Sequence, residues 1–370
     1  MSDFHGIIFA YKAYPELREL VQQRTAASLP ICGRYRLIDF ALSSMRNAGI
    51  TDVGIIMQRD YQSLLDHLGS GKPWDMSKRI GGLKMLPPFG LPDYHRGDYS
   101  GTIEALNCVG NYIRDIPQKY VVLLLGNLCG NLDLEAVYRQ HRETGVGITA
   151  ICGNYQPDII HHRYVVGDDG YIKKVLFDRM GPGEGIPSLE GYVINKDILL
   201  RLMDQCKAQG LVRFHGDAIS MYLREGGTMR PYVHTRYARF VRTVEGYYDA
   251  NMDILDPVNR AAVFPADRPV RTKHPEGVST YYGEQARSVN CLVADNCRIE
   301  GSIENCIVFP GVRIGKGSVL KNCIVLKDTV VAENTLLEHV IADKGVEFSA
   351  NISLIGSDKL PIVVPKGAKI

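Results

Sequence analysis

The chain has 370 residues, which exceeds the usual size of one domain and predicts two. Its formal net charge is +2, and acidic and basic residues are mixed along the whole chain. This balance argues against a nucleic-acid-binding face and against a polybasic segment for anionic lipid. The N-terminus lacks the pattern of a secretory signal, and no apolar run reaches membrane-spanning length. We therefore expect a cytoplasmic protein that binds neither nucleic acid nor membrane.

Nine cysteines are scattered from Cys32 to Cys323, and none forms a C-x-x-C pair. An odd, dispersed set of this kind indicates neither a disulfide framework nor a zinc site. We expect most of these cysteines to be small buried apolar residues.

Residues 1–249 alternate short aliphatic runs with amphipathic stretches. The run GIIFA at 6–10 is followed by a stretch with helical spacing at 35–50 and by a second aliphatic run at 52–57. The continuous apolar run YVVLLLG at 120–126 is typical of a central parallel strand that is buried on both faces. Strands that alternate with helices predict a doubly wound, Rossmann-like α/β domain.

Residues 250–285 break this alternation with prolines at 257, 265, 269 and 275, and we expect a linker that runs over the surface. Over residues 286–370, aliphatic residues recur about every six positions, with turn pairs between them. This period predicts a parallel β-helix in which each coil buries one aliphatic residue per side. Cys297, Cys306 and Cys323 would then be interior residues. A chance run of short antiparallel strands is the alternative.

Four blocks of the sequence closely resemble bacterial ADP-glucose pyrophosphorylases, and they occur in the order GRYRLIDFALSSMRNAGITDVGIIMQ, GKPWD, ANMDILDP and FPGVRIGKGSVLKNCIV. The resemblance covers essentially the whole chain. It implies a nucleotidyltransferase domain followed by a left-handed β-helix of hexapeptide repeats. In that family the first domain joins glucose 1-phosphate to ATP, with release of pyrophosphate and ADP-glucose.

This chemistry requires a glycine-rich turn for the triphosphate, cationic side chains beside it, and carboxylates that hold magnesium. The family's glycine turn follows the first strand, where this chain has Tyr11 and Lys12. Large side chains there would fill the space of the phosphates. The family's phosphate-binding lysine, in its A-K-P motif, is aligned with Ala26, so a cation is missing as well.

The resemblance also places the family's two metal-binding aspartates at Asn127, after the central strand, and at Phe240. An amide supplies no charge to a hard cation, and phenylalanine cannot bind a metal. The loss of positioning, electrostatics and metal together predicts an inactive site. We therefore expect no catalytic residues, no metal and no cofactor in this chain, although a catalytic partner would need magnesium.

The resemblance implies a remnant of the nucleotide and sugar-phosphate pocket at Gly101, Thr102, Gly126, Asn127 and Arg179. An N-cap of the following helix by Thr102 is the alternative explanation of the first two residues. Arg179 lies near the position of the family's sugar-phosphate lysine and would keep a phosphate contact.

Arg24 stands where many family members hold an arginine that binds anionic effectors between the two domains. A solvated surface arginine is the alternative. Arg36 and Asp39 are expected to form a structural pair rather than a site. The adjacent His161 and His162 fit no metal-ligand spacing and are expected on a solvent-facing loop.

This set of losses resembles the non-catalytic D-type subunit that accompanies the catalytic subunit in some bacteria. It implies a regulatory partner subunit of ADP-glucose pyrophosphorylase in glycogen biosynthesis, in a hetero-oligomer for which a tetramer is expected. Association of this chain with copies of itself, into a homo-oligomer, is a further hypothesis. Two other hypotheses are a weakly active glucose-1-phosphate adenylyltransferase that makes ADP-glucose, and a stand-alone sensor of sugar phosphates.

Overall fold

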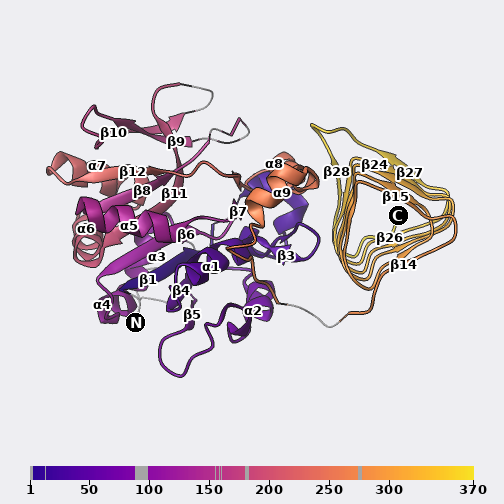
Figure 1. Cartoon of the computed structure of the whole chain (residues 1–370), viewed down its shortest axis with the longest axis horizontal. Helices are drawn as coiled ribbons and strands as arrows, with labels where there is room; N and C mark the ends of the chain where they lie inside the picture. Colours follow the sequence, from indigo (N-terminus) through magenta and orange to yellow (C-terminus); the bar gives the residue numbers. More distant parts are fainter. Residues whose placement is uncertain are drawn as a thin grey trace.

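The computed structural model describes residues 3–12, 14–87, 99–154, 156–157, 159, 161–179, 183–273 and 277–370, with the backbone alone for His161, Asp178 and Arg179. An N-terminal α/β unit lies beside a C-terminal β-helix that is triangular in cross-section (Figure 1). None of the helices formed by the described residues is long and apolar enough to cross a membrane.

The N-terminal unit is built on one mixed sheet. Its main strands run in the order β12 (Met229–Val233), β8 (Ile148–Cys152), β11 (Ile186–Asn195), β6 (Tyr120–Leu125), β1 (Phe4–Phe9), β4 (Val53–Ile56), β5 (Leu83–Leu86). β1 pairs in parallel with β4 and β6, and β4 pairs in parallel with β5. β11 is antiparallel to both β6 and β8. The predicted doubly wound α/β fold is confirmed, with an antiparallel strand that the sequence pattern did not indicate.

Two further strands extend this sheet. β9 (His161–Val166) and β10 (Ile172–Arg179) form an antiparallel hairpin that pairs with the N-terminal part of β11. His161 and His162 therefore lie on a strand, and the loop predicted for them is wrong. Two small pairs complete the strands of this unit, β2 (Pro30–Ile31) with β3 (Tyr35–Arg36) and β7 (Leu128–Gly130) with β13 (Ala238–Phe240).

The α-helices of the unit begin and end where local sequence favours it. Their bounds are α1 (Leu37–Asn47), α2 (Gln62–Leu68), α3 (Thr102–Cys108), α4 (Gly110–Asp115), α5 (Leu134–Thr144), α6 (Lys196–Ala208), α7 (Ile219–Arg224), α8 (Val244–Met252) and α9 (Pro257–Val263). The carboxylate of Asp133 accepts the N–H of Ala136 at the start of α5. The same helix ends at Gly145, whose φ of 62° lies in the left-handed region that glycine adopts readily.

The shorter helical turns are η1 (Pro15–Val21), η2 (Ala26–Ser28), η3 (Lys72–Trp74) and η5 (Asp253–Leu255), together with the π-helical turn η4 (Phe214–Ala218). The Asp39 carboxylate accepts the backbone N–H of Arg36 at 2.9 Å, and its other oxygen lies 2.5 Å from Nε2 of His67. The Arg36 guanidinium instead donates to the hydroxyl of Ser63 at 2.9 Å. Arg36 and Asp39 are thus joined through the backbone at the start of α1.

Residues 250–285 contain more structure than a linker. α8 crosses position 249, α9 follows it, and β14 (Tyr281–Tyr282) already belongs to the β-helix. Between them, the backbone of Arg271 accepts a hydrogen bond from Nε1 of Trp74 at 3.1 Å, and its N–H donates to the hydroxyl of Ser43 at 2.8 Å. This segment is therefore held against the N-terminal unit. Pro275 lies outside the described residues.

The C-terminal unit consists of three parallel sheets of five strands. The first contains β14, β17 (Arg298–Ile299), β20 (Arg313–Ile314), β23 (Val330–Val331) and β26 (Glu347–Phe348). The second contains β15 (Arg287–Val289), β18 (Ser302–Glu304), β21 (Val319–Lys321), β24 (Leu336–Glu338) and β27 (Ser353–Ile355). The third contains β16 (Leu292–Val293), β19 (Ile307–Val308), β22 (Ile324–Val325), β25 (Val340–Ala342) and β28 (Ile362–Val364). The predicted left-handed parallel β-helix is confirmed, and the alternative of antiparallel strands is wrong.

The coil length explains the irregular hexapeptide register of the sequence. Ile314 pairs with Val331 and Leu320 pairs with Leu337, a separation of 17 positions in each case. Three full hexapeptides would give about 18. The interior of the coils holds Cys297, Cys306 and Cys323, as predicted. Between β25 and β28 the pairing residues are 22 positions apart, because six residues, 356–361, connect β27 to β28, whereas His339 alone connects β24 to β25.

One corner of the β-helix carries a ladder of polar side chains. Asn290, Asn305, Asn322 and His339 occupy it in successive coils, with φ values of 50°, 50°, 53° and 50°. Asparagine tolerates this left-handed conformation better than most residues. The amide of Asn290 donates to Asn305 at 2.8 Å, and the amide of Asn305 donates to Asn322 at 3.2 Å. The ladder therefore fixes the spacing of neighbouring coils at their corner.

The third sheet of the β-helix is apolar on both faces. Its outward residues, Leu292, Ile307, Ile324, Ile341 and Val363, stand in register in successive coils. Ile307, Ile324 and Ile341 are fully buried, in one cluster with Leu17 of η1 and Tyr247 of α8. This aliphatic row is the contact between the two units.

A buried ion pair crosses the same contact. Arg24 of the N-terminal unit donates to the carboxylate of Asp343 in the β-helix, and the two side chains are 4% and 1% exposed. Asp343 also accepts the backbone N–H of Lys344 at 2.6 Å. A second pair, Arg34 with Asp295 at 3.3 Å, joins the units at the surface, where both side chains are exposed.

We expect Ile324→Ala to lower the free energy of unfolding by about 2–5 kcal/mol, since it removes a fully buried side chain from the contact between the units. Val330→Ala is the matched control, because Val330 faces outward on another side and is 38% exposed. It should change the free energy by no more than about 0.5 kcal/mol. Urea unfolding followed by circular dichroism measures both values. Equal losses for the two variants would show that the aliphatic row does not hold the units together.

We expect Arg24→Met to destabilise the protein by about 3–5 kcal/mol, because it leaves the Asp343 carboxylate buried without a counter-charge. The double variant Arg24→Met with Asp343→Asn should lose clearly less than the single one. Arg34→Met, at the exposed pair, should cost no more than about 1 kcal/mol. The same urea titration tests all three variants. A double variant at least as unstable as Arg24→Met alone would contradict the pairing.

Candidate functional site

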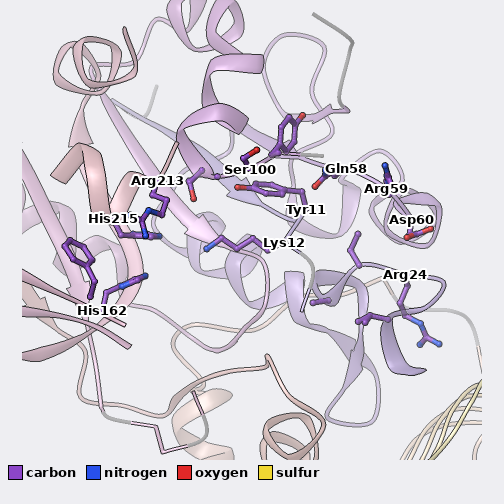
Figure 2. Close-up of a pocket in the computed structure, with 18 residues that line it drawn as sticks. Tyr11, Lys12, Arg24, Gln58, Arg59, Asp60, Ser100, His162, Arg213 and His215 are labelled. Atoms are coloured by element: carbon purple, nitrogen blue, oxygen red, sulfur yellow. The ribbon is translucent and has the colours of Figure 1, made fainter. Parts of the chain in front are cut away.

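The main cleft of the N-terminal unit lies beyond the carboxyl ends of β1 and β4, where open α/β sheets bind ligands. Its volume is about 640 Å³. The loop after β1 contributes Tyr11 and Lys12, and the start of α3 contributes Thr102. The far wall comes from His162 on β9 and His215 on η4 (Figure 2).

Tyr11 fills the region in which the sequence predicted a blocked phosphate turn. Its ring is 7% exposed and meets the ring of Tyr99 edge-on at 4.9 Å between centroids. Burial raises the pKa of Tyr11 to about 12, so its hydroxyl stays protonated at neutral pH. The side chain therefore presents no charge to the cleft and occupies space that an open glycine turn would leave free.

The ammonium group of Lys12 is paired with a carboxylate of the protein. Its ammonium donates to Oε2 of Glu190 at 3.0 Å, and Arg242 donates to Oε1 of the same carboxylate at 2.5 Å. Nε2 of His215 lies 3.1 Å from Oε2. Glu190 is 4% exposed, and its carboxylate is thus surrounded by three basic side chains. We call Lys12, Glu190, His215 and Arg242 the basic cluster.

The charges of the basic cluster follow from its geometry. Burial alone would raise the pKa of Glu190, but Arg242 and Lys12 outweigh it and hold that pKa well below its ordinary value. Burial opposes the charge of Lys12, but Glu190 outweighs burial and raises the pKa of the ammonium. Burial lowers the pKa of His215 despite the neighbouring Glu190 carboxylate. At neutral pH the cluster therefore contains two cations, one anion and a neutral imidazole.

Glu190 reaches the cluster through an irregularity in β11. The pairing of β11 with β8 shifts register between Ser188 and Gly191, and Glu190 between them has φ of 49°. A β-bulge of this kind redirects a side chain that regular pleating would point elsewhere. The hydroxyl of Ser188 accepts the backbone N–H of Glu190 at 2.9 Å and supports the bulge.

The two positions aligned with metal-binding aspartates are closed. The side-chain amide of Asn127 donates to the carbonyl of Val241 at 3.0 Å. Phe240 is 1% exposed, and its ring is covered by the guanidinium of Arg242 at 4.2 Å. Magnesium requires charged oxygen ligands, which these two residues do not supply. The described residues contain no group of three or more Asp, Glu, His or Cys arranged to hold a metal ion.

The glycines of the expected remnant pocket have packing explanations. A Cβ atom on Gly126 would lie 2.9 Å from the Cβ of Ala27, and one on Gly101 would lie 2.3 Å from the carbonyl oxygen of Val212. Thr102 is the first residue of α3 and Gly101 is its N-cap, so the N-cap predicted at Thr102 is wrong. Thr102 is 5% exposed at the cleft wall.

Of the remaining residues singled out in the sequence, Ala26 and His162 line the cleft, whereas the side chain of Arg179 lies outside the described residues. Ala26 lines the cleft and is buried there. Arg179 is the last residue of β10 and pairs with His161, but its side chain lies outside the described residues. His162 is half-buried at the cleft and stacks on His215 at 5.2 Å between ring centroids. His162 therefore lines the cleft with a partly exposed side chain.

Arg24 lies at the junction of the cleft with the β-helix. It is 4% exposed, so the alternative of a solvated surface arginine is wrong. Its Nη1 is buried and has no hydrogen-bond partner among the described residues. A second cleft of about 460 Å³ lies between the units, and its charged lining includes Arg36, Lys273, Lys327 and Lys344 together with Asp66, Asp295 and Asp328. Burial, reinforced by the positive charges of Arg36 and Arg24, lowers the pKa of Lys344 to about 7.

Comparisons with known proteins agree with this arrangement. The family model described as nucleotidyl transferase matches residues 16–164, and the model of a GlmU-like C-terminal hexapeptide domain matches residues 276–360. The glycogen biosynthesis protein GlgD of Bacillus subtilis is 32% identical, over 98% of this chain and 95% of that protein. The protein of the same name from Geobacillus stearothermophilus is 32% identical, over 85% and 82%.

A related enzyme is also similar. The glucose-1-phosphate adenylyltransferase of Acetivibrio thermocellus is 28% identical, over 89% of this chain and 78% of the enzyme. The resemblance found in the sequence blocks is thus confirmed over both units. The chain belongs to the family of the glycogen biosynthesis protein GlgD, which is related to the glucose-1-phosphate adenylyltransferases.

Proposed function

We propose that this chain is a non-catalytic, regulatory subunit that associates with a catalytic glucose-1-phosphate adenylyltransferase in glycogen biosynthesis. The basic cluster carries the proposal, because its two cations are already engaged by Glu190 where a catalytic subunit would offer cations to its substrate. The names of the similar proteins support the pathway. The site of action would be the cytoplasm, in a hetero-oligomer with a tetramer as its expected form.

Electrostatics argue against catalysis by this chain. Enzymes that transfer nucleotidyl groups stabilise developing negative charge with cations and metal ions that are fixed in advance. Here Lys12 and Arg242 are both paired with the carboxylate of Glu190, and the residues at the metal positions are Asn127 and Phe240. The catalytic partner, rather than this chain, would hold the magnesium. The alternative is a weakly active enzyme, which an activity assay of the isolated chain would detect.

The isolated chain should form no more than a trace of ADP-glucose from ATP, glucose 1-phosphate and magnesium. Asn127→Asp with Phe240→Asp should not restore activity, because Tyr11 and the basic cluster still occupy the phosphate region. Added to the catalytic subunit, the chain should change KM or the effector response and reach saturation at a fixed ratio. Pyrophosphate release and gel filtration measure both properties. Turnover by the isolated chain within about tenfold of the catalytic subunit's rate would contradict the proposal.

We also propose that the cleft between the units binds a doubly charged oxyanion as the regulatory ligand. Lys344 lines this cleft, and its positive charge is disfavoured by burial and by the nearby guanidinium groups of Arg36 and Arg24. A bound anion would relieve this repulsion. It would therefore raise the pKa of Lys344 above its value of about 7 in the free protein.

The affinity for sulfate should consequently fall as pH rises above about 7, since binding then requires uptake of a proton by Lys344. Linkage gives a loss of about fivefold between pH 7 and pH 8. Sulfate is the probe because its own charge is constant over this range. Lys344→Gln should weaken binding and abolish its pH dependence, whereas Lys316→Gln, at an exposed position of the same β-helix, should change neither. Calorimetric titration at constant ionic strength measures the constants. A pH-independent affinity in the wild-type chain would contradict this role of Lys344.

A further inference from the structure

We propose that Lys12, His215 and Arg242 form a latent oxyanion site, and that Glu190 is an internal anion that keeps this site closed. The ligand class is a tetrahedral oxyanion such as inorganic phosphate, or the phosphoryl group of a small metabolite. The proposal rests on the proposed function in placing phosphate chemistry at this cleft. The proposed function states that this cleft lacks the residues of an active enzyme. The further point is that the carboxylate of Glu190 occupies the donors of the cleft.

The geometry of the donors supports this assignment. Lys12 and His215 approach the same oxygen of Glu190, at 3.0 and 3.1 Å, while Arg242 approaches the other oxygen at 2.5 Å. Donors of this kind, spread around two oxygens, match those that bind phosphate through charge-assisted hydrogen bonds. Figure 2 shows Lys12 extending across the cleft toward His215. Both residues line the cleft, so an anion from solvent would have access to the same donors.

Two of the three basic side chains, Arg242 and His215, have contacts that position them without Glu190. The guanidinium of Arg242 lies over the rings of Phe240 and Tyr14, at 4.2 and 5.5 Å from their centroids. Nδ1 of His215 lies 2.6 Å from the hydroxyl of Tyr192. Removal of the carboxylate would therefore leave two of the three donors in place, with an uncompensated positive charge.

Glu190 is a replaceable part of this arrangement. Its φ of 49° lies in the region that favours glycine, and its neighbour in the bulge is Gly191. A glutamate held there has a backbone conformation that is unfavourable for its residue type. Glu190→Gly should therefore be compatible with the backbone of β11 and should open space at the cluster.

The test compares Glu190→Gln and Glu190→Gly with a chain that keeps Glu190. All three proteins also carry Lys344→Gln, so that the cleft between the units does not contribute to the measured phosphate binding. Thermal midpoints and calorimetric titrations are recorded with sodium phosphate and with sodium chloride at equal ionic strength. We expect both variants to bind phosphate in the millimolar range, at least about tenfold more tightly than the wild-type background. Chloride should have no comparable effect.

Two controls decide the assignment. Lys12→Gln added to Glu190→Gly should weaken phosphate binding by about tenfold or more, because it removes one charged donor. Asp204→Asn, at the exposed pair with Arg114, should leave phosphate binding unchanged. A folded Glu190→Gly chain that binds phosphate no better than the wild-type background would overturn the proposal, as would binding that is unaffected by Lys12→Gln. The assay uses the isolated chain, so failure of the partner role would appear separately, in the mixed kinetic assay.

Discussion

Burial of aliphatic side chains on both faces of one β-helix sheet determines how the rest of the molecule is arranged. The inward face fills the coils, and the outward row of isoleucines packs into the N-terminal unit. Its partners include Leu17 on η1 and Tyr247 on α8. η1 follows the loop of Lys12, and α8 follows Arg242. The segments that carry Lys12 and Arg242 thus lead directly into elements that are anchored on the β-helix.

This anchoring fixes the positions of the charged side chains at the cleft. A catalytic site needs donors that are fixed in position but free of internal partners until substrate arrives. In this chain the donors are fixed but already satisfied, since Glu190 accepts from both Lys12 and Arg242. The nearby metal positions show the same substitution of internal contacts for ligand contacts, because Asn127 donates to a backbone carbonyl. The fold of the family is retained while the polar groups of the cleft bind one another.

The sequence predicted the architecture well, because its signals are periodic. The apolar run at 120–126 became the central strand β6, and the aliphatic recurrence became the β-helix. Register within the coils was harder to infer, since a 17-residue coil departs from the hexapeptide period. The antiparallel direction of β11 has no local signature, because strand direction depends on how distant segments pair.

Sequence reasoning predicted the site residues that a family motif marks. It missed the residues whose role depends on how the chain folds. Tyr11 and Lys12 were identified by the missing glycine turn, but Glu190, the partner of Lys12, was not. A signal for Glu190 existed, since a carboxylate stands inside the stretch LEGYVI of the buried strand β11. Its direction depends on a β-bulge, which the alternation of residues does not reveal. The burial of Arg24 was likewise missed, because its partner Asp343 lies 319 positions away in the chain.

The corner ladder of Asn290, Asn305 and Asn322 suggests how such a chain can change length during evolution. Asn290, Asn305 and Asn322 link three successive coils by contacts of one kind, although the coil length changes from 15 to 17 positions between them. Addition or loss of a whole coil would keep this kind of contact. The longer connection between β27 and β28 also lies at a corner, outside the strands. The aliphatic row lengthens or shortens by one residue per coil. Descendants of one ancestral subunit can therefore differ in the height of this column while they keep the same contact with the nucleotidyltransferase-like unit.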